Sequence, residues 1–266
     1  MESASKDVLF TIAMNLDLPS LLRWCQSNSR INKHVCQNDD VWRNRLLRDY
    51  PDYLKFHLNK SLGETYVFLY QLSYIKKLLN TNKSLYEIFL KNGLDLSHKD
   101  LKKVPAFDLP NLQELSLSYN HLTEVPAFNL PNLQILMLSD NQLTKLPPFN
   151  LPNLQILFLF DNHLTEVPAF GLPNLRKLSL SYNYLTAVPA FDLPNLQILF
   201  LRNNQLTEVP AFNLPNLQEL YLQKNQLTEV PAFNLPNLKE LYLQDNQLTE
   251  VTKKELKQKY GNKVYL

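Results

Sequence analysis

Only a few side chains in this 266-residue sequence have a type and spacing that could serve catalysis or metal binding. Cys25 and Cys36 are the candidate nucleophiles, and His98, His121 and His163 are the candidate metal ligands. The histidines lack a cysteine or carboxylate cluster at the spacing of a metal site. Cys25 falls on the apolar face of an expected helix, where an inert core thiol is the ordinary case. The sequence therefore predicts a chain that is not an enzyme and holds no metal or cofactor.

A second group of side chains is suited to binding another protein. Six aromatic or cationic residues occupy matching positions in the C-terminal part of the chain: Phe158, Phe160, Phe200, Arg202, Tyr221 and Tyr242. Exposed aromatic rings near an arginine are typical of protein-binding hot spots. Whether these six residues share one surface depends on the elements that present them.

A unit of 21 residues, first complete at residues 109–129, explains the matching positions. The unit begins again at Leu130, Leu151, Leu172, Leu193, Leu214 and Leu235. A fixed period of this length is typical of a solenoid, in which each unit buries its apolar side against its neighbours. Each unit contains the pattern Leu-x-x-Leu-x-Leu-x-x-Asn-x-Leu and so resembles the leucine-rich-repeat family. We therefore expect a parallel sheet of short strands at residues 94–251, formed by one partial and seven complete repeats.

The short strand of each repeat predicts which side chains face outward. Leu115 and Leu117 alternate with Ser116 and Ser118, so the leucines point inward and the serines outward. The six aromatic and cationic residues stand at the serine positions of later repeats. Because adjacent strands lie about 4.8 Å apart, the six side chains would form a strip on the concave sheet face. The alternative is that the rings only cover each other across neighbouring strands.

Two further columns of the repeat are interpreted as structural. Asparagine side chains can satisfy backbone groups at the turn after each strand. This column consists of Asn120, Asn141, Asn162, Asn183, Asn204, Asn225 and Asn246. The phenylalanines from Phe107 to Phe233 can fill the space behind the sheet. Prolines flank them, as at Pro126 and Pro131, and predict an extended convex side without a regular helix.

The first 50 residues show helical spacing in place of repeats. Short amphipathic helices of this kind are stable only when they pack together or against a partner. The stretch resembles an F-box at Val8, Leu9, Ile12, Leu16, Leu21, Cys25, Val35 and Trp42. The resemblance implies docking onto a Skp-type adaptor of a cullin ubiquitin ligase, with candidate contacts Val8, Leu9, Ile12, Leu18, Pro19 and Leu21. The alternative is a small helical cap whose apolar residues are all core.

The remaining segments connect and close these parts. Residues 51–93 are predicted to be a helical linker and N-terminal cap, since Ser61 and Glu64 have capping-box spacing ahead of an apolar helix. Residues 252–266 are predicted to be a C-terminal cap, because the repeat pattern stops after Leu248 and a helix with a polar face follows. The expected fold is α/β, a leucine-rich-repeat solenoid preceded by a small all-α, F-box-like domain at residues 1–50.

Composition narrows the expected partners. The net charge of +2 gives no electrostatic reason to expect nucleic acid or a membrane surface, so the expected partner is a protein. Two cysteines are too few for the disulfide-rich end caps of secreted arrays, which favours an intracellular location, cytoplasmic or nuclear. We expect a monomer apart from these partners.

The leading hypothesis is that the chain recruits substrates to a Skp–cullin–F-box ubiquitin ligase and binds them on the concave sheet face. The alternative is a leucine-rich-repeat protein that binds or sequesters its target with no ubiquitin-ligase link. The near-identity of the repeats, together with the F-box-like head, resembles repeat proteins encoded by large DNA viruses.

Overall fold

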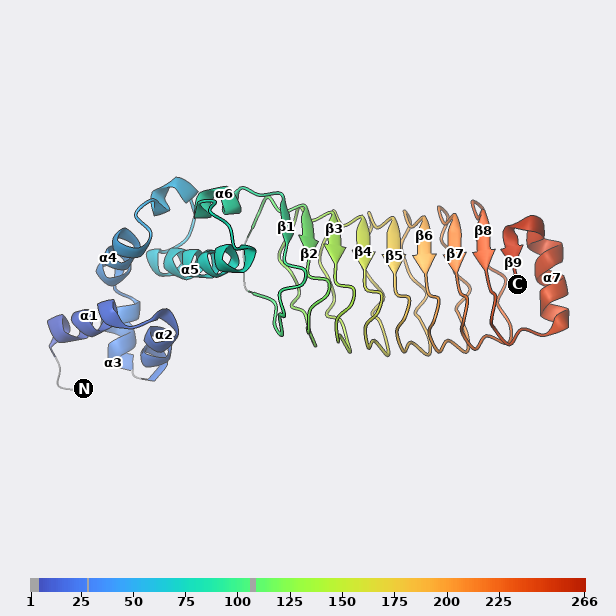
Figure 1. Ribbon diagram of the computed structural model, residues 1–266, viewed down its shortest axis with the longest axis horizontal. Helices are drawn as coiled ribbons and strands as arrows, with labels where there is room; N and C mark the ends of the chain where they lie inside the picture. The colour runs from blue at the N-terminus through green and yellow to red at the C-terminus, as the bar shows by residue number, and fades with distance from the viewer. Residues whose placement is uncertain (1–4, 28, 106–108) are drawn as a thin grey trace. The chain divides into compact units, whose positions relative to one another are not determined.

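The computed structural model describes residues 5–27, 29–105 and 109–266. The chain forms two compact units, a helical head within residues 1–90 and a repeat array from residues 91–104 and 109–266 (Figure 1). Each unit has its own core and is described by itself below.

The head consists of short helices whose starts are fixed by side-chain caps. Its elements are α1 (Lys6–Asn15), α2 (Leu18–Ser27), α3 (Ser29–Ile31), the π-helical turn η1 (Asn32–Cys36), α4 (Asp39–Asp49), the 3-10 turn η2 (Tyr53–Phe56), α5 (Leu62–Leu79) and α6 (Leu85–Phe89). The Asp17 carboxylate accepts a hydrogen bond from the Ser20 backbone N–H at the start of α2. The predicted capping box of Ser61 and Glu64 is present at the start of α5.

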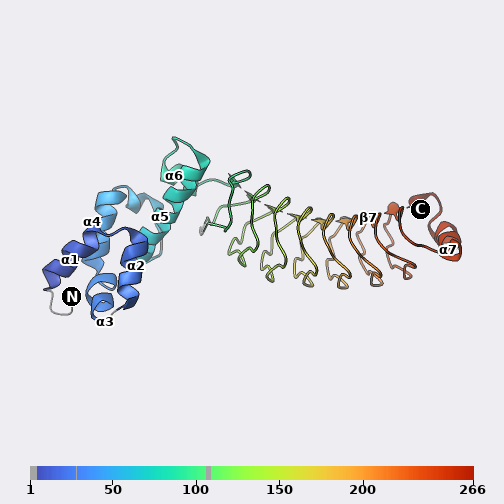
Figure 2. The same ribbon diagram turned by 60° about the horizontal axis from the view of Figure 1, so that its bottom comes forward.

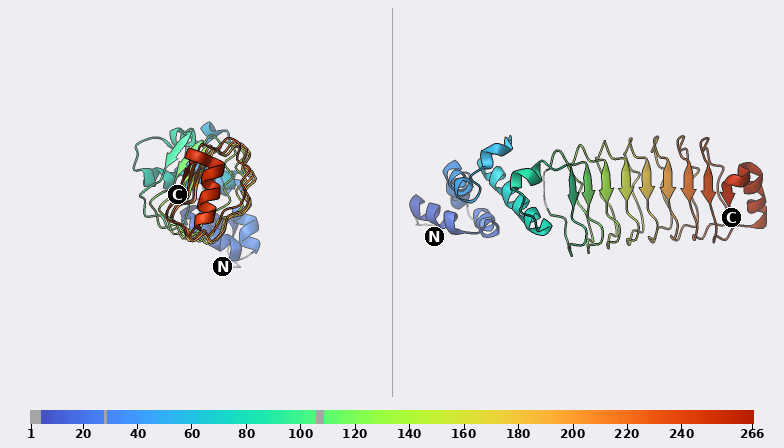
Figure 3. Two further views of the ribbon diagram at one scale, coloured as in Figure 1. Left: turned by 90° about the vertical axis from the view of Figure 1, so that its right-hand side faces the viewer. Right: turned by 45° about the horizontal axis from the view of Figure 1, so that its top comes forward.

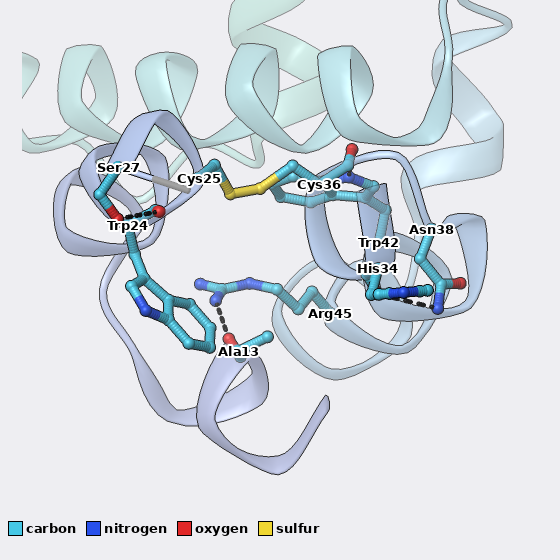
Figure 4. The surroundings of a disulfide bond; sticks show 9 residues. All are labelled: Ala13, Trp24, Cys25, Ser27, His34, Cys36, Asn38, Trp42 and Arg45. Atoms are coloured by element: carbon cyan, nitrogen blue, oxygen red, sulfur yellow. Dashed lines mark hydrogen bonds between the residues drawn. A yellow bond between two sulfur atoms is a disulfide. The ribbon is translucent and has the colours of Figure 1, made fainter. Parts of the chain in front are cut away.

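The core of the head is built around a buried arginine. Arg45 on α4 is 2% exposed, and its Nη1 donates hydrogen bonds to the carbonyl oxygens of Ala13 (2.7 Å) and Leu16 (2.9 Å). These carbonyls belong to the C-terminal end of α1, where backbone acceptors have no partner within the helix. Figure 4 shows the Arg45 side chain reaching Ala13. Arg45 therefore ties α4 to the end of α1.

The two cysteines of the head are joined in a disulfide, with Cα atoms 6.2 Å apart (Figure 4). The prediction that Cys25 is an inert core thiol is therefore wrong. The reason is that η1 packs against α2 and brings Cys36 to a side chain 11 residues earlier in the chain. Trp42 holds this turn by donating a hydrogen bond from Nε1 to the Cys36 carbonyl over 2.9 Å.

The array is a sheet of nine parallel strands in sequence order, as Figure 1 shows. The strands are β1 (Gly93–Asp95), β2 (Glu114–Ser116), β3 (Ile135–Met137), β4 (Ile156–Phe158), β5 (Lys177–Ser179), β6 (Ile198–Phe200), β7 (Glu219–Tyr221), β8 (Glu240–Tyr242) and β9 (Val264–Tyr265). From β1 to β8 each residue pairs with the residue 21 positions later, as Leu115 pairs with Leu136. Equivalent residues of successive repeats therefore form straight columns.

The repeat leucines and the predicted asparagine column make the interior of the array. Leu115, Leu117 and their equivalents are buried. In the repeat of β4, Asn162 accepts a hydrogen bond from the Leu143 N–H of the preceding repeat (3.0 Å) and donates to the carbonyls of Leu138 (3.0 Å) and Leu159 (3.2 Å). The predicted structural role of the asparagines is confirmed.

The returning segments on the other side of each repeat are extended, as the prolines predicted. Between β2 and β8 these segments contain no helix, and Figure 2 shows their coils stacked one behind the other. Buried phenylalanines stack from Phe128 to Phe233, with neighbouring ring centroids 5.8 to 6.5 Å apart. Phe107, the first member of the predicted column, lies outside the described residues.

A second asparagine ladder runs along these segments and was not predicted. From the second complete repeat onward, the exposed asparagine of Leu-Pro-Asn-Leu donates to the carbonyl of the proline one repeat earlier, as Asn153 does to Pro131 over 2.8 Å. The same bond is made by Asn132, Asn174, Asn195, Asn216 and Asn237. Both sides of each repeat are thus linked to the previous one.

The C-terminal segment contains the predicted helix and one unpredicted strand. Helix α7 (Glu250–Tyr260) starts at Thr249, whose side chain accepts from the Thr252 N–H. In the end-on view of Figure 3, α7 crosses the end of the coil. The last residues then form β9, which pairs with β8 and continues the sheet. This strand could not be predicted, because Val264 and Tyr265 lack the leucine pattern of the repeats.

Candidate functional site

The outward positions of the strands form one surface, which we call the sheet face. Register pairing places Phe158, Ser179, Phe200, Tyr221 and Tyr242 side by side in a single column. Phe160 lies two residues after Phe158, and Arg202 lies two residues after Phe200. Both therefore belong to the next outward column. All five predicted aromatic side chains are partly exposed and Arg202 is exposed. The structure thus brings the six predicted residues onto one face.

The aromatic rings at the C-terminal end of this column stack face to face. The ring centroids of Phe200 and Tyr221 are 4.5 Å apart, and those of Tyr221 and Tyr242 are 4.7 Å apart. Tyr265 of β9 continues the stack, 4.5 Å from Tyr242. The ring faces therefore cover each other, as the alternative interpretation expected. The edges of these partly exposed rings remain accessible on the sheet face. Tyr265 was not predicted because β9 does not carry the repeat pattern.

Lys177 occupies the gap that Ser179 leaves between Phe158 and Phe200. Its Nζ lies 5.4 Å from the ring centroid of Phe158 and 5.3 Å from that of Phe200. An ammonium group at this distance is attracted to the face of each ring. Lys177 thus joins Phe158 to the stack. The sequence carries a signal for this contact. The strand of this repeat has Lys177 and Ser179 at the two outward positions where both neighbouring strands have isoleucine and phenylalanine.

Arg202 is held by a tyrosine at the edge of the sheet face. Its Cζ lies 5.0 Å from the ring centroid of Tyr182, and its Nη2 donates a hydrogen bond to the Tyr182 hydroxyl. Tyr182 has a left-handed backbone conformation with φ of 56° and is 43% exposed. This conformation recurs just before each ladder asparagine of the seven complete repeats. Tyr182 was not among the predicted site residues, because it lies outside the strand positions.

The tyrosines of the stack are anchored by glutamates on the same strands. The Tyr221 hydroxyl donates to Glu219 over 2.8 Å, and the Tyr242 hydroxyl donates to Glu240 over 2.7 Å. The hydrogen bond to Glu240 raises the pKa of Tyr242 to about 12. Burial, followed by the hydrogen bond to Glu219, also raises the pKa of Tyr221. Both phenols therefore stay protonated and fix the ring positions at neutral pH.

An apolar area adjoins the rings between β3 and β6. It consists of the partly exposed side chains of Ile135, Met137, Ile156, Phe158, Phe160 and Ile198. A surface of aromatic and aliphatic side chains with few charges is suited to excluding water from an interface. The arrangement can therefore bind a protein surface.

The described part of the chain offers neither a metal-binding cluster nor a membrane-spanning helix. Residues 5–27, 29–105 and 109–266 contain no group of three or more histidine, cysteine, aspartate or glutamate side chains that could hold a metal ion. Among the same residues, no helix combines the length and apolar character needed to cross a membrane.

The predicted adaptor contacts of the head fall into two classes. Leu9, Leu18 and Leu21 are 1%, 4% and 0% exposed, so they are core residues of the head. Val8 is 49% exposed, Pro19 is exposed and Ile12 is partly exposed. Only the second class can contact a partner without rearrangement of the head. Helical periodicity could not separate the two classes, because core and docking surface have the same spacing.

Comparison with known proteins places the array in a family. The family model described as leucine-rich repeats (2 copies) matches six overlapping stretches, residues 110–151, 131–172, 152–193, 173–214, 194–232 and 215–257. The chain belongs to the leucine-rich-repeat family. The helical head lies outside the matched residues of this leucine-rich-repeat protein. Leucine-rich repeats are generally protein-interaction modules. A search of curated proteins found no match.

Solved structures with the same fold come from an animal and from bacteria. A chain of the Toll–Spätzle complex of Drosophila, described as a molecular hub in development and innate immunity, is 31% identical with a TM-score of 0.54. The match covers 58% of this leucine-rich-repeat protein and 23% of the Drosophila chain. The leucine-rich-repeat domain of a Shigella effector is 24% identical with a TM-score of 0.56, covering 81% and 95% of the two chains.

A third similar structure is YopM, a leucine-rich effector protein from Yersinia pestis. It is 24% identical with a TM-score of 0.52, and the match covers 75% of this chain and 60% of YopM. At such identities the two bacterial matches support the fold alone.

Proposed function

We propose that this leucine-rich-repeat protein is the substrate-recruiting subunit of a Skp–cullin–F-box ubiquitin ligase. In this role the head binds a Skp-type adaptor and the sheet face binds the substrate protein. The chain then acts by bringing the substrate near the ligase and does no chemistry of its own. An intracellular location, cytoplasmic or nuclear, is part of the same proposal.

The aromatic strip is the observation that carries the substrate-binding half of the proposal. Phe200, Tyr221 and Tyr242 are locked in a stack, so little side-chain entropy is lost when a partner covers them. The aliphatic side chains beside Phe158 extend the apolar area. Rigid aromatic anchors of this kind dominate the energy of protein interfaces.

The adaptor-binding half rests on the F-box resemblance and on exposed apolar side chains in the first two helices. Val8 on α1 and Leu22 on α2 are 49% and 37% exposed. Pro19 is exposed on α2 and Ile12 is partly exposed on α1. Apolar side chains exposed on small helices support a docking role for the head.

Adaptor binding is tested with the full-length chain and a purified Skp-type adaptor. We expect a complex that Val8→Asp weakens at least tenfold, because a carboxylate would be buried in an apolar interface. Leu54→Asp is the matched control, since Leu54 is 70% exposed on η2 and not on α1 or α2, which carry the expected contacts. Absence of any complex, or equal loss in both variants, would reject the adaptor role.

Substrate binding is tested by identifying proteins that co-purify with the full-length chain and by measuring their ubiquitylation in a reconstituted ligase. Phe158→Ala combined with Tyr221→Ala should abolish both signals while the circular dichroism spectrum stays native. Tyr119→Ala combined with Tyr184→Ala is the matched control, since both rings are 49% exposed but lie off the strand positions. A substrate that the first variant still binds would exclude the strip as the site.

The cysteine pair favours the alternative function, a binding or sequestering protein with no ubiquitin-ligase link. Disulfides such as Cys25–Cys36 persist mainly in oxidising compartments, whereas the ligase proposal needs a reducing one. Thiol labelling of the protein inside its native cells decides between them. Two reactive thiols after denaturation support the ligase proposal, and a protected pair supports the alternative.

A further inference from the structure

The ammonium group of Lys177 lies in an apolar environment near the middle of the aromatic strip. Strand pairing places Lys177 between Ile156 and Ile198, and its Nζ lies between the rings of Phe158 and Phe200. All five side chains are partly buried. A cation surrounded by four apolar groups has lost part of its hydration.

Lys177 has no counter-ion within the described part of the array. Among residues 91–104 and 109–266, no ion pair or hydrogen bond includes its Nζ. The nearest acidic side chains on the following strands, Glu219 and Glu240, accept hydrogen bonds from Tyr221 and Tyr242. The two aromatic rings attract the ammonium group but do not neutralise its charge.

Two more cations lie in the repeats of β5 and β6. Arg176 precedes Lys177 in the chain and is exposed. Arg202 is fixed over Tyr182 in the outward column next to that of Phe200. These two repeats thus carry three cations in a chain whose net charge is only +2. A partner that covers this area needs a negative group to avoid burying Lys177 unpaired.

We infer that the sheet face recognises a protein segment carrying an aspartate or glutamate side chain flanked by apolar residues, and that its carboxylate pairs with Lys177. The flanking residues of the partner cover Phe158 and Ile156 on one side and Phe200 and Ile198 on the other. This inference rests on the proposed binding role of the sheet face and adds the chemistry of the bound segment. Because the Lys177 ammonium group is partly dehydrated, pairing with it selects a carboxylate at this position of the bound segment.

Peptide selection on the immobilised full-length chain tests the inference. The library displays random segments with both ends joined to a carrier, so that no free C-terminal carboxylate is present. Selected sequences should contain one aspartate or glutamate between apolar residues. Synthetic peptides with blocked ends should lose about tenfold in affinity when this acid becomes the corresponding amide.

Exchange of Lys177 then shows which group the acid contacts. With Lys177→Met the acidic peptide and its amide should bind equally well, while Lys177→Arg should keep the preference. The control Lys239→Met removes a lysine whose Nζ donates to Gln218 over 2.8 Å and should leave the preference unchanged. A preference for the acid that survives Lys177→Met, or selected peptides without an acid, would overturn the inference.

The same experiment separates this inference from the proposed function. Selected peptides that lack an acid but are lost in the Phe158→Ala, Tyr221→Ala variant would reject the carboxylate and support the sheet face as a binding surface. Enrichment of no sequence, or binding that this variant does not change, would count against both.

Discussion

The guanidinium group of Arg45 lies over the ring of Tyr66, with Cζ 4.6 Å from the ring centroid, and its Nη2 donates a hydrogen bond to the Tyr66 hydroxyl over 2.9 Å. The Tyr66 hydroxyl in turn donates to Asp49 over 2.6 Å. One buried side chain thus connects α4 to α5 as well as to α1.

Replacing this arginine should destabilise the head. Arg45→Met leaves the carbonyls of Ala13 and Leu16 without their donor and should cost about 3 kcal/mol of unfolding free energy. Denaturant unfolding followed by tryptophan fluorescence measures the change. Arg43→Met on the same helix is the control, because Arg43 makes only an exposed ion pair with Asp40 and should contribute less than about 0.5 kcal/mol. Equal midpoints for both variants would contradict the structural role of Arg45.

The two asparagine ladders should contribute differently to the unfolding free energy of the array. Asn162→Ala removes an acceptor and several donor contacts to buried backbone groups and should cost about 3 kcal/mol. Asn153→Ala removes one exposed hydrogen bond to Pro131 and should cost less than about 1 kcal/mol. Denaturation midpoints by circular dichroism compare the two. An equal loss of stability in Asn153→Ala and Asn162→Ala would show that the buried ladder contributes no more than the exposed one.

Two glycines should respond oppositely to alanine. A Cβ on Gly63 would lie 2.9 Å from Nε1 and 3.0 Å from Cε2 of Trp42, and the rigid indole cannot move away without disturbing its hydrogen bond to Cys36. Gly63→Ala should therefore destabilise the head by about 1 to 2 kcal/mol. Gly171 has open space around it, so Gly171→Ala should be neutral or stabilise by up to about 1 kcal/mol. Thermal unfolding of both variants checks the contrast.

The phenol of Tyr242 should ionise at a higher pH than that of an ordinary tyrosine. Its pKa is raised from 10.0 to about 12 in the folded chain, so the folded state binds the phenolic proton more tightly than the unfolded state. The stability from this proton is therefore fully present below pH 10 and is lost as the pH rises through about 12. Absorbance titration of tyrosinate follows the ionisation.

Glu240→Gln removes the acceptor charge and should move the ionisation of Tyr242 toward pH 10. Glu229→Gln removes the same charge from an exposed side chain that is not among the causes of the raised pKa of Tyr242, and is the control for net charge. An unchanged titration in Glu240→Gln would show that the carboxylate does not hold the phenol.

Much of the array could be predicted from the sequence, because a 21-residue period leaves few ways to bury the leucines. Leu115 and Ser116 alternate, and that alternation already determines which side of the sheet each residue faces. The contact between Lys177 and the rings could not be predicted. It depends on the reach of a long side chain from one outward column into the next, over the small Ser179.

The head was harder to interpret because its signals are local. The start of α5 was predictable, since the capping box uses side chains three residues apart. Leu9 and Val8 are neighbours with similar chemistry, yet one is buried and the other exposed, and only the packing of α1 against the rest of the head decides this. The Cys25–Cys36 contact likewise depends on the path of η1.

The constant pairing offset between strands has a consequence for how new binding specificities arise. Because each unit fits onto either neighbour in the same register, a copy of the unit of β3 inserted between β5 and β6 would preserve the interlocking of the backbone. It would nevertheless move Phe200 to the second strand from Lys177, place a methionine in the position beside it, and so dismantle the carboxylate position. Recombination between near-identical repeats can therefore change the partner in one genetic step, with no loss of fold on the way.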